Sequence, residues 1–166
     1  MYNRNSLINL SAVLTHIPVA VAFVRGDAEH RSINGTVKFF STPKGTVVFA
    51  EVSGLPVSDE KCGKNIFAFH VHSGGSCTGN SDDPFVDVGM HDNPTDCPHP
   101  YHAGDMPPLF SANGTAFLAF LTDRFTADKI IGKTVIIHDS PDDFTTQPSG
   151  NAGKKIACGE IVSVRR

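Results

Sequence analysis

Short segments in which apolar and polar residues alternate, with no helical segment between them, are the feature that most limits how this chain can fold. They span residues 18–25, 35–40, 45–52, 65–72, 114–121, 133–138 and 157–164, and they are rich in Val, Phe and Thr. Turn-forming Gly, Pro, Asn or Ser residues bound them, as is typical of β-strands. Parallel neighbours would need a crossover of about a dozen residues or more, usually helical, between strands. The pattern therefore predicts an all-β, antiparallel β-sandwich or barrel.

Two long segments, residues 73–110 and 139–153, interrupt this pattern. They are rich in Gly, Asp, Pro, Asn and His, and five of the eight His and two of the four Cys lie in them or beside them. Loops longer than about 12–15 residues in a compact domain are usually functional or disordered. Because His and Cys are concentrated here, we expect functional loops that metals and disulfides hold in place.

Size and charge exclude several classes of protein. The 166 residues fit one domain, which we place at residues 18–166 after an N-terminal extension of residues 1–17. The net charge is −3 with only 14 Lys and Arg, and no basic stripe indicates a nucleic-acid partner. No apolar run approaches the roughly 20 residues that span a bilayer, so we expect no membrane partner.

The compartment is less constrained by the sequence. Residues 1–17 lack the continuous apolar segment of a secretory signal. Four Cys permit two disulfides, which favours an oxidising, extracytoplasmic compartment, although four reduced Cys in a cytosolic protein also fit.

Histidines form the strongest chemical signal in the chain. In the predicted strand 65–72, His70 and His72 share one face while Phe67, Phe69 and Val71 share the other, which we expect to face the core. Two imidazoles at this spacing can converge on one metal. Taken alone, they could equally be two exposed histidines on an edge strand.

Further ligands follow along the chain. His91, His99, His102 and Asp105 lie within 15 residues and suit a four-coordinate zinc site with nitrogen and oxygen ligands. His70, His72 and His138, with or without a share in His91, form an all-imidazole set suited to copper. The clustering predicts metal binding.

The motifs resemble those of the copper–zinc superoxide dismutase family over residues 18–164. They are Phe69-His70-Val71-His72, Gly75-Ser76-Cys77, His91-Asp92-Asn93-Pro94, His102-Ala103-Gly104-Asp105, Val135-Ile136-Ile137-His138, Gly150-Asn151-Ala152-Gly153 and Ile156-Ala157-Cys158-Gly159. Residues 98–102, and a Cys soon after the His-Val-His strand, resemble bacterial members. The resemblance implies an immunoglobulin-like Greek-key sandwich or barrel of about eight strands.

The resemblance also implies a role for particular residues. Asp142 would hydrogen-bond a ligand histidine of each metal, and Cys77 would pair with Cys158. Lys155 would be the cation that guides superoxide to copper. The implied metal ligands are His70, His72, His91 and His138 for copper, and His91, His99, His102 and Asp105 for zinc, with His91 bridging the two metals and delivering a proton.

Three positions depart from the family pattern. Asp92 stands where relatives have an aromatic or apolar residue; it could alter the copper potential, but we expect it to face solvent. Lys155 replaces an Arg, and His99 lies unusually close to His102. Beside the implied disulfide, Cys62 and Cys97 could form a second bridge.

The implied activity is disproportionation of superoxide to dioxygen and hydrogen peroxide by Cu(II)/Cu(I) cycling, with zinc organising the site. The alternative is a copper- or zinc-binding module without turnover, for metal storage, delivery or scaffolding. The presence of His138 and Lys155 favours the enzyme. Monomer and homodimer both remain open.

Overall fold

The strands form one antiparallel sheet that is rolled into a nearly closed barrel. A computed structural model describes residues 7–164. The strands are β1 (Ala20–Gly26), β2 (Asn34–Thr42), β3 (Gly45–Ser53), β4 (Ile66–Phe67), β5 (Phe69–His72), β6 (Leu109–Ala112), β7 (Thr115–Thr122), β8 (Thr134–His138) and β9 (Lys155–Ser163). Two short helices complete the described chain, α1 (Leu10–Leu14) and the 3₁₀ turn η1 (Val86–Val88).

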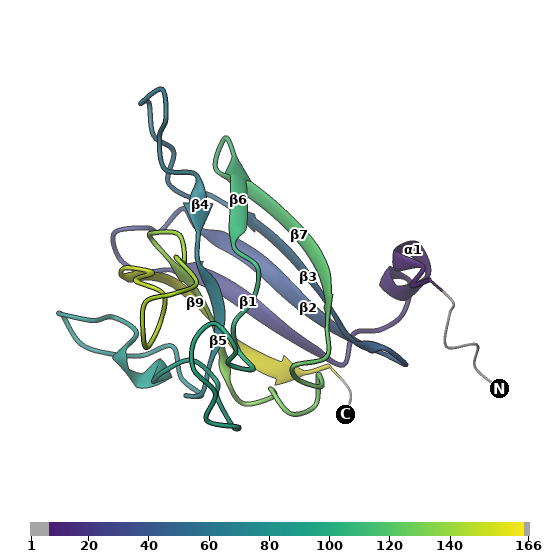
Figure 1. The fold of residues 1–166 in the computed structure, drawn as a ribbon. Coiled ribbons are helices and arrows are strands. Elements are labelled where there is room, and N and C mark those ends of the chain that lie inside the picture. The colour runs from purple at the N-terminus through teal and green to yellow at the C-terminus, as the bar shows by residue number, and fades with distance from the viewer. Residues whose placement is uncertain (1–6, 165–166) are drawn as a thin grey trace.

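The order of the strands explains the closure. The sheet runs β4-β6-β7-β3-β2-β1-β9-β8-β5, and β4 and β5, its two ends, are separated in sequence by Ala68 alone. Ala68 accepts a hydrogen bond from the His138 backbone and donates one to the carbonyl of Ser140. One continuous stretch of chain therefore joins the two ends of the sheet, as Figure 1 shows.

The expected antiparallel all-β fold is confirmed, and residues 7–164 form nine strands. The expected strand 65–72 divides at Ala68 into β4 and β5. The four-residue β6 lies at the end of the expected loop 73–110, where the sequence predicted no strand. Residues 42–45 form the tight turn that joins β2 and β3, whose last pair is Thr42 with Gly45.

The core consists of the apolar side chains that the strands direct into the barrel. Phe67, Phe69 and Val71 are buried in it, as their shared face predicted. Their neighbours in this cluster include Ala22, Val24, Val37, Phe39, Val48, Leu109, Val135, Ile137 and Ile161. The barrel is thus a filled scaffold, and the long loops lie outside it.

Both long loops lie on the same side of the barrel. Figure 1 shows the teal chain after β5 beside the yellow-green chain that connects β8 to β9. In contrast, α1 stands away from the barrel and buries none of its residues. The expected extension, residues 1–17, lies partly outside the described residues. Between residues 7 and 164, no helix has the length and apolar character needed to cross a bilayer.

Candidate metal centre

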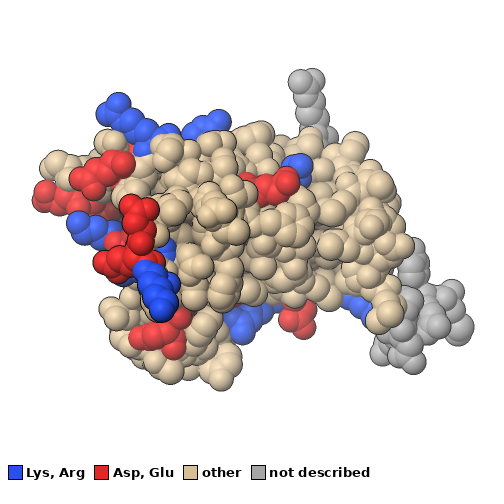
Figure 2. Space-filling model, turned by 90° about the horizontal axis from the view of Figure 1, so that it is seen from above, with Lys and Arg blue, Asp and Glu red and all other residues tan. Residues whose placement is uncertain are grey.

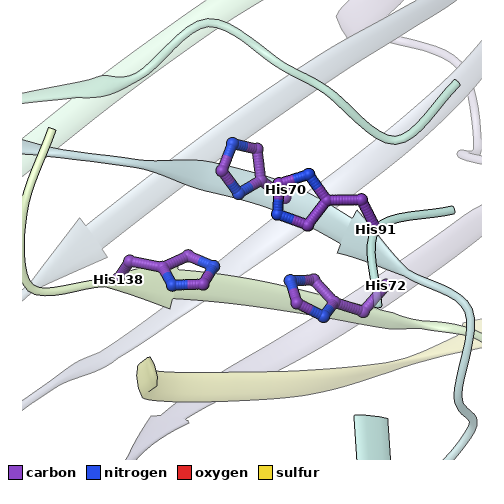
Figure 3. Close-up of side chains that lie close together, drawn as sticks. All are labelled: His70, His72, His91 and His138. Carbon is purple, nitrogen blue, oxygen red and sulfur yellow. The ribbon is translucent and has the colours of Figure 1, made fainter. Parts of the chain in front are cut away.

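Four histidines converge where β5, β8 and the first long loop meet. β5 pairs with β8, so that His70 lies opposite Ile136, and His138 is the last residue of β8. An isolated β-bridge between His72 and His91 brings the loop against β5. The ring centroids of His70 and His91 are 3.9 Å apart, and those of His72 and His138 are 5.5 Å apart. Figure 3 shows the four rings grouped around a common space.

A second set of ligands shares one of these histidines. His91, His99, His102 and Asp105 each offer a ligand atom within 4.8 Å of the others, and the same holds for His70, His72, His91 and His138. Asp105 Oδ1 lies 2.8 Å from His91 Nδ1, and Asp105 Oδ2 lies 3.1 Å from His99 Nδ1. The structure thus brings every metal ligand expected from the sequence into one of two adjoining groups, and His91 belongs to both. We call the first set, His70, His72, His91 and His138, the copper-type group, and the second, His91, His99, His102 and Asp105, the zinc-type group.

The ring nitrogens that face these groups are buried without a hydrogen-bond partner among the described residues. They are His70 Nδ1, His72 Nε2, His91 Nε2, His99 Nδ1, His102 Nδ1 and His138 Nε2. A buried polar atom without a partner is costly, and native structures normally provide one. A cation coordinated by these nitrogens would remove that cost. The donor sets therefore fit two metal ions.

The opposite ring nitrogens are fixed by hydrogen bonds. His72 Nδ1 and His138 Nδ1 lie 2.9 and 3.3 Å from the carbonyl oxygens of Gly89 and Gly153. Asp142 lies 2.8 Å from His70 Nε2 through Oδ2, and 2.9 Å from His99 Nε2 through Oδ1. Such partners select the tautomer and orient the ring for a metal. Asp142 therefore has the contacts expected of it, one to a histidine of each group.

Burial favours the neutral form of three of the imidazoles. Desolvation lowers the pKa of His70, lowers that of His72 well below its ordinary value, and lowers that of His138 to about 3. For Asp142, burial favours the neutral acid, but hydrogen bonds from His70, the Phe144 backbone and His99 outweigh it and lower the pKa to about 2. Neutral imidazoles and ionised carboxylates are the protonation states that metal ions need.

These pKa shifts predict that the metal-free protein loses stability in mild acid. The unfolded chain binds protons at histidine near pH 6.5, whereas folded His138 binds one only near pH 3. Between these values the unfolded state holds more protons, so the free energy of unfolding falls as the pH falls. We expect a loss of up to about 1.4 kcal/mol per pH unit for each such histidine. Urea denaturation of the metal-free protein at pH 7 and pH 5 measures it, and equal midpoints would contradict the prediction.

Three further residues support the zinc-type group through contacts that the sequence did not indicate, although Gly150 stands in one of the family motifs. Gln147 Nε2 donates to the His99 carbonyl at 2.7 Å, and the His99 N–H donates to Gln147 Oε1 at 3.0 Å. Arg124 Nη1 donates to the carbonyl of Pro100 at 2.8 Å. A Cβ at Gly150, which has φ +70°, would lie 2.0 Å from Asp142 Oδ1. These contacts join distant parts of the chain, and no local sequence pattern marks them.

The burial of Asp92 differs from what the sequence led us to expect. This residue was expected to face solvent, but it is buried at 5% exposure and forms an ion pair with Lys133. Its backbone N–H donates to the Val71 carbonyl, and its own carbonyl accepts from Gly104. The backbone beside His91 is thus fixed in the barrel wall, which turns the carboxylate inward, and the half-buried ammonium of Lys133 compensates its charge.

One of the two expected disulfides is present. Cys77 and Cys158 form a disulfide with a Cα–Cα distance of 5.7 Å, which ties the first long loop to β9. The expected second bridge is wrong, because Cys62 and Cys97 are both free. Cys62 lies on the exposed segment before β4, whereas the Cys97 N–H and carbonyl are bonded to Asn93 beside the metal ligands.

A cavity of about 470 Å³ opens onto the copper-type group. Its lining includes His72, His91 and His138, together with Lys154 and Lys155. A larger cavity, of about 770 Å³, lies beside the segment before β4 and contains none of the ligands. On the face in Figure 2, charged side chains of both signs gather toward one end and the rest is mostly uncharged. Because the net charge of the chain is −3, electrostatic attraction of an anion to this cavity must come from cations near it, such as Lys154 and Lys155.

The fold and the site together define a β-barrel protein with two metal-binding groups that share one histidine. Residues 33–161 match the family model described as copper/zinc superoxide dismutase. The chain therefore belongs to the copper/zinc superoxide dismutase family, which uses copper and zinc.

Relatives extend this match over most of the chain. The copper–zinc superoxide dismutase 2 of Aquifex aeolicus is 32% identical over 76% of this chain and 78% of its own length. The copper–zinc superoxide dismutase of Deinococcus radiodurans is 32% identical over 80% and 79%. In fold, the chain is similar to the copper/zinc superoxide dismutase from Brucella abortus, with a TM-score of 0.70 at 22% identity, over 85% of this chain and 98% of that chain.

Proposed function

We propose that this chain is a superoxide dismutase, which converts two superoxide anions and two protons into dioxygen and hydrogen peroxide. Copper would be held by His70, His72, His91 and His138, and zinc by His91, His99, His102 and Asp105. Copper bound by imidazoles supplies the one-electron oxidation and reduction, whereas zinc has no redox chemistry and organises the site. The observation that carries this proposal is the sharing of His91 between two groups of buried, unpartnered ring nitrogens.

Three histidines of the copper-type group, His70, His72 and His138, are held in fixed orientations. The backbone carbonyls of Gly89 and Gly153 and the carboxylate of Asp142 hold three of the rings in place. Because burial keeps the rings neutral, they remain available as ligands throughout the neutral pH range. A rigid, dry set of donors limits rearrangement when the charge at the site changes.

His91 can hold a proton where the reaction consumes one. Its Nδ1 faces Asp105 at 2.8 Å, and its unpartnered Nε2 faces the copper-type group. With both nitrogens bound to metal, the ring would carry no proton. When Nε2 is not a ligand, it would be free to hold a proton beside the cavity and donate it to the reduced substrate.

Lys155 lies where a cation can act on the incoming anion. It lines the cavity, and in the sheet it pairs with His138 across β8 and β9. We assign it the role of attracting superoxide toward the copper-type group. A local cation of this kind can raise the association rate by roughly tenfold or more, and the effect weakens with salt.

Asp105→Ala is expected to remove zinc and to lower thermal stability. Asp105 contacts three histidines of its group and accepts a hydrogen bond from the His102 backbone, so its loss releases the loop as well as the metal. Zinc affinity should fall by more than the roughly 10- to 100-fold typical of residues that only support a ligand. Because metal binding contributes to folding, the melting temperature of the zinc-loaded protein should fall too.

Calorimetry and zinc titration measure both effects. Asp123→Ala removes an exposed carboxylate outside both groups and serves as the control. An Asp105→Ala protein that retained its zinc and its melting temperature would show that the zinc assignment is wrong.

The proposed activity is tested by loading the protein with one copper and one zinc and following superoxide loss. The enzyme should remove superoxide catalytically and retain its copper in the presence of a reductant and a copper(I) chelator. Stoichiometric copper without superoxide loss, and release of that copper to the chelator, would instead support a module for metal storage or delivery.

A further inference from the structure

An ion pair holds Lys155 at the mouth of the cavity. The ammonium of Lys155, at the start of β9, donates to Asp83 Oδ2 in the first long loop, 72 residues earlier. The side chains of Lys155 and Asp83 are 17% and 36% exposed, respectively. The contact is therefore partly shielded from water yet open to a small anion that enters the cavity.

Asp83 is the more rigid partner. Its Oδ1 accepts the Phe85 N–H at 3.0 Å, and its own N–H donates to Asn80 Oδ1 at 3.0 Å. The same loop is tied to β9 by the Cys77–Cys158 disulfide. Lys155 instead has a long, flexible side chain whose charge can move between partners. The loop thus fixes a carboxylate and the carboxylate holds the cation.

The Lys155 ammonium acts electrostatically on His138 of the copper-type group, but the carboxylates around the cavity outnumber the cations there. Burial is the main cause of the low pKa of His138, and the Lys155 ammonium lowers that pKa further. The cavity lining carries four carboxylates, Asp27, Glu29, Asp82 and Asp83, against the two ammonium groups of Lys154 and Lys155. The mouth is therefore formally negative, although the proposed substrate is an anion.

We infer that Asp83 restrains the capture of anions at the copper-type group by competing with them for the Lys155 ammonium. The inference rests on the proposed function for the identity of the anion. Superoxide competes with the Asp83 carboxylate for the charge of the Lys155 ammonium, so Asp83 acts through Lys155 as a positioning residue. Neutralising Asp83 frees the cation at the place where the anion enters.

The variant Asp83→Asn tests this role with little change to the fold, because the amide oxygen can still accept the Phe85 N–H. The matched control is Asp82→Asn, which removes the same charge from the same cavity lining but has no contact with Lys155. Removing one charge roughly 10 Å from a monovalent anion in water changes its association by about twofold. We expect that twofold effect for Asp82→Asn, and about four- to tenfold for Asp83→Asn at low salt.

A double-mutant cycle separates the effect of the Asp83–Lys155 ion pair, which we call the tether, from the general effect of removing one negative charge. In a Lys155→Met background, Asp83→Asn should give only the same twofold effect as Asp82→Asn. The two quantities to measure are kcat/KM for superoxide at several salt concentrations and the affinity of the copper-loaded protein for azide, a monovalent anion that binds copper. Equal effects of the two Asp variants, or an Asp83→Asn effect that persists without Lys155, would overturn the inference.

Chemical labelling tests the tether without copper or turnover. In the zinc-loaded protein, acetic anhydride should modify Lys155 several-fold faster after Asp83→Asn and at an unchanged rate after Asp82→Asn, as read by peptide mass spectrometry. Unchanged labelling after Asp83→Asn would show that the carboxylate does not hold the ammonium. If labelling and azide binding follow the prediction while no superoxide is consumed, the proposed function fails and the tether stands.

Discussion

Replacing His138 by Ala is expected to reduce superoxide dismutation by at least about 100-fold, more than the loss of a residue that only supports a ligand. His138 belongs to the copper-type group and not to the zinc-type group, so zinc should remain bound. The other three histidines would hold copper weakly, with one side of the ion open to water. Dismutation per bound copper and zinc content, measured on the same preparation, check both parts of the prediction.

The matched control is His16→Ala, because His16 lies in the segment that follows α1 and belongs to neither group. It should leave dismutation and metal content unchanged. Loss of zinc together with copper in His138→Ala would show that the two groups do not act as separate sites. Full activity would remove His138 from the copper ligands.

Removing the Cys77–Cys158 disulfide is expected to have the largest effect on stability. The two residues are 81 positions apart, so the bond closes a long loop of the unfolded chain. Loop entropy gives up to about 4–5 kcal/mol, which corresponds to a fall in melting temperature of roughly 10–15 °C for a domain of this size. The double variant Cys77→Ser, Cys158→Ala tests this, with Ala at the position that is buried in the barrel wall.

The free cysteines provide the control for this variant. Cys62→Ser with Cys97→Ser should change the melting temperature by no more than about 2 °C, because neither residue forms a disulfide. Non-reducing peptide mapping of the unmodified protein should give the Cys77–Cys158 peptide alone. A Cys77–Cys97 peptide would contradict the pairing in the structure.

The barrel could be predicted because several of its strands alternate apolar with polar residues and no helical segment separates them. The shared face of Phe67, Phe69 and Val71 is enough to place His70 and His72 on the opposite side. The exact strands were harder to define. Ala68 bonds to His138 and Ser140 across the sheet ends, which divides one apparent strand in two, and this depends on closure of the barrel rather than on local sequence.

The metal ligands were predictable because His and Asp cluster within two loops and their flanking strands. Their division between copper and zinc came from resemblance to a family, and from the residues alone the sharing of His91 remained open. The ion pair of Asp92 with Lys133, and that of Lys155 with Asp83, were not predictable. Each joins side chains more than 40 positions apart, and only the folded barrel brings them together.

The central claim, that His91 lies between one copper and one zinc, is tested most directly by anomalous diffraction at the absorption edges of both metals from crystals of the loaded protein. We expect a copper peak among His70, His72, His91 and His138, and a zinc peak among His91, His99, His102 and Asp105. Zinc should lie about 2.0–2.1 Å from its histidine nitrogens. A single peak, or two peaks of which only one adjoins His91, would contradict the shared site.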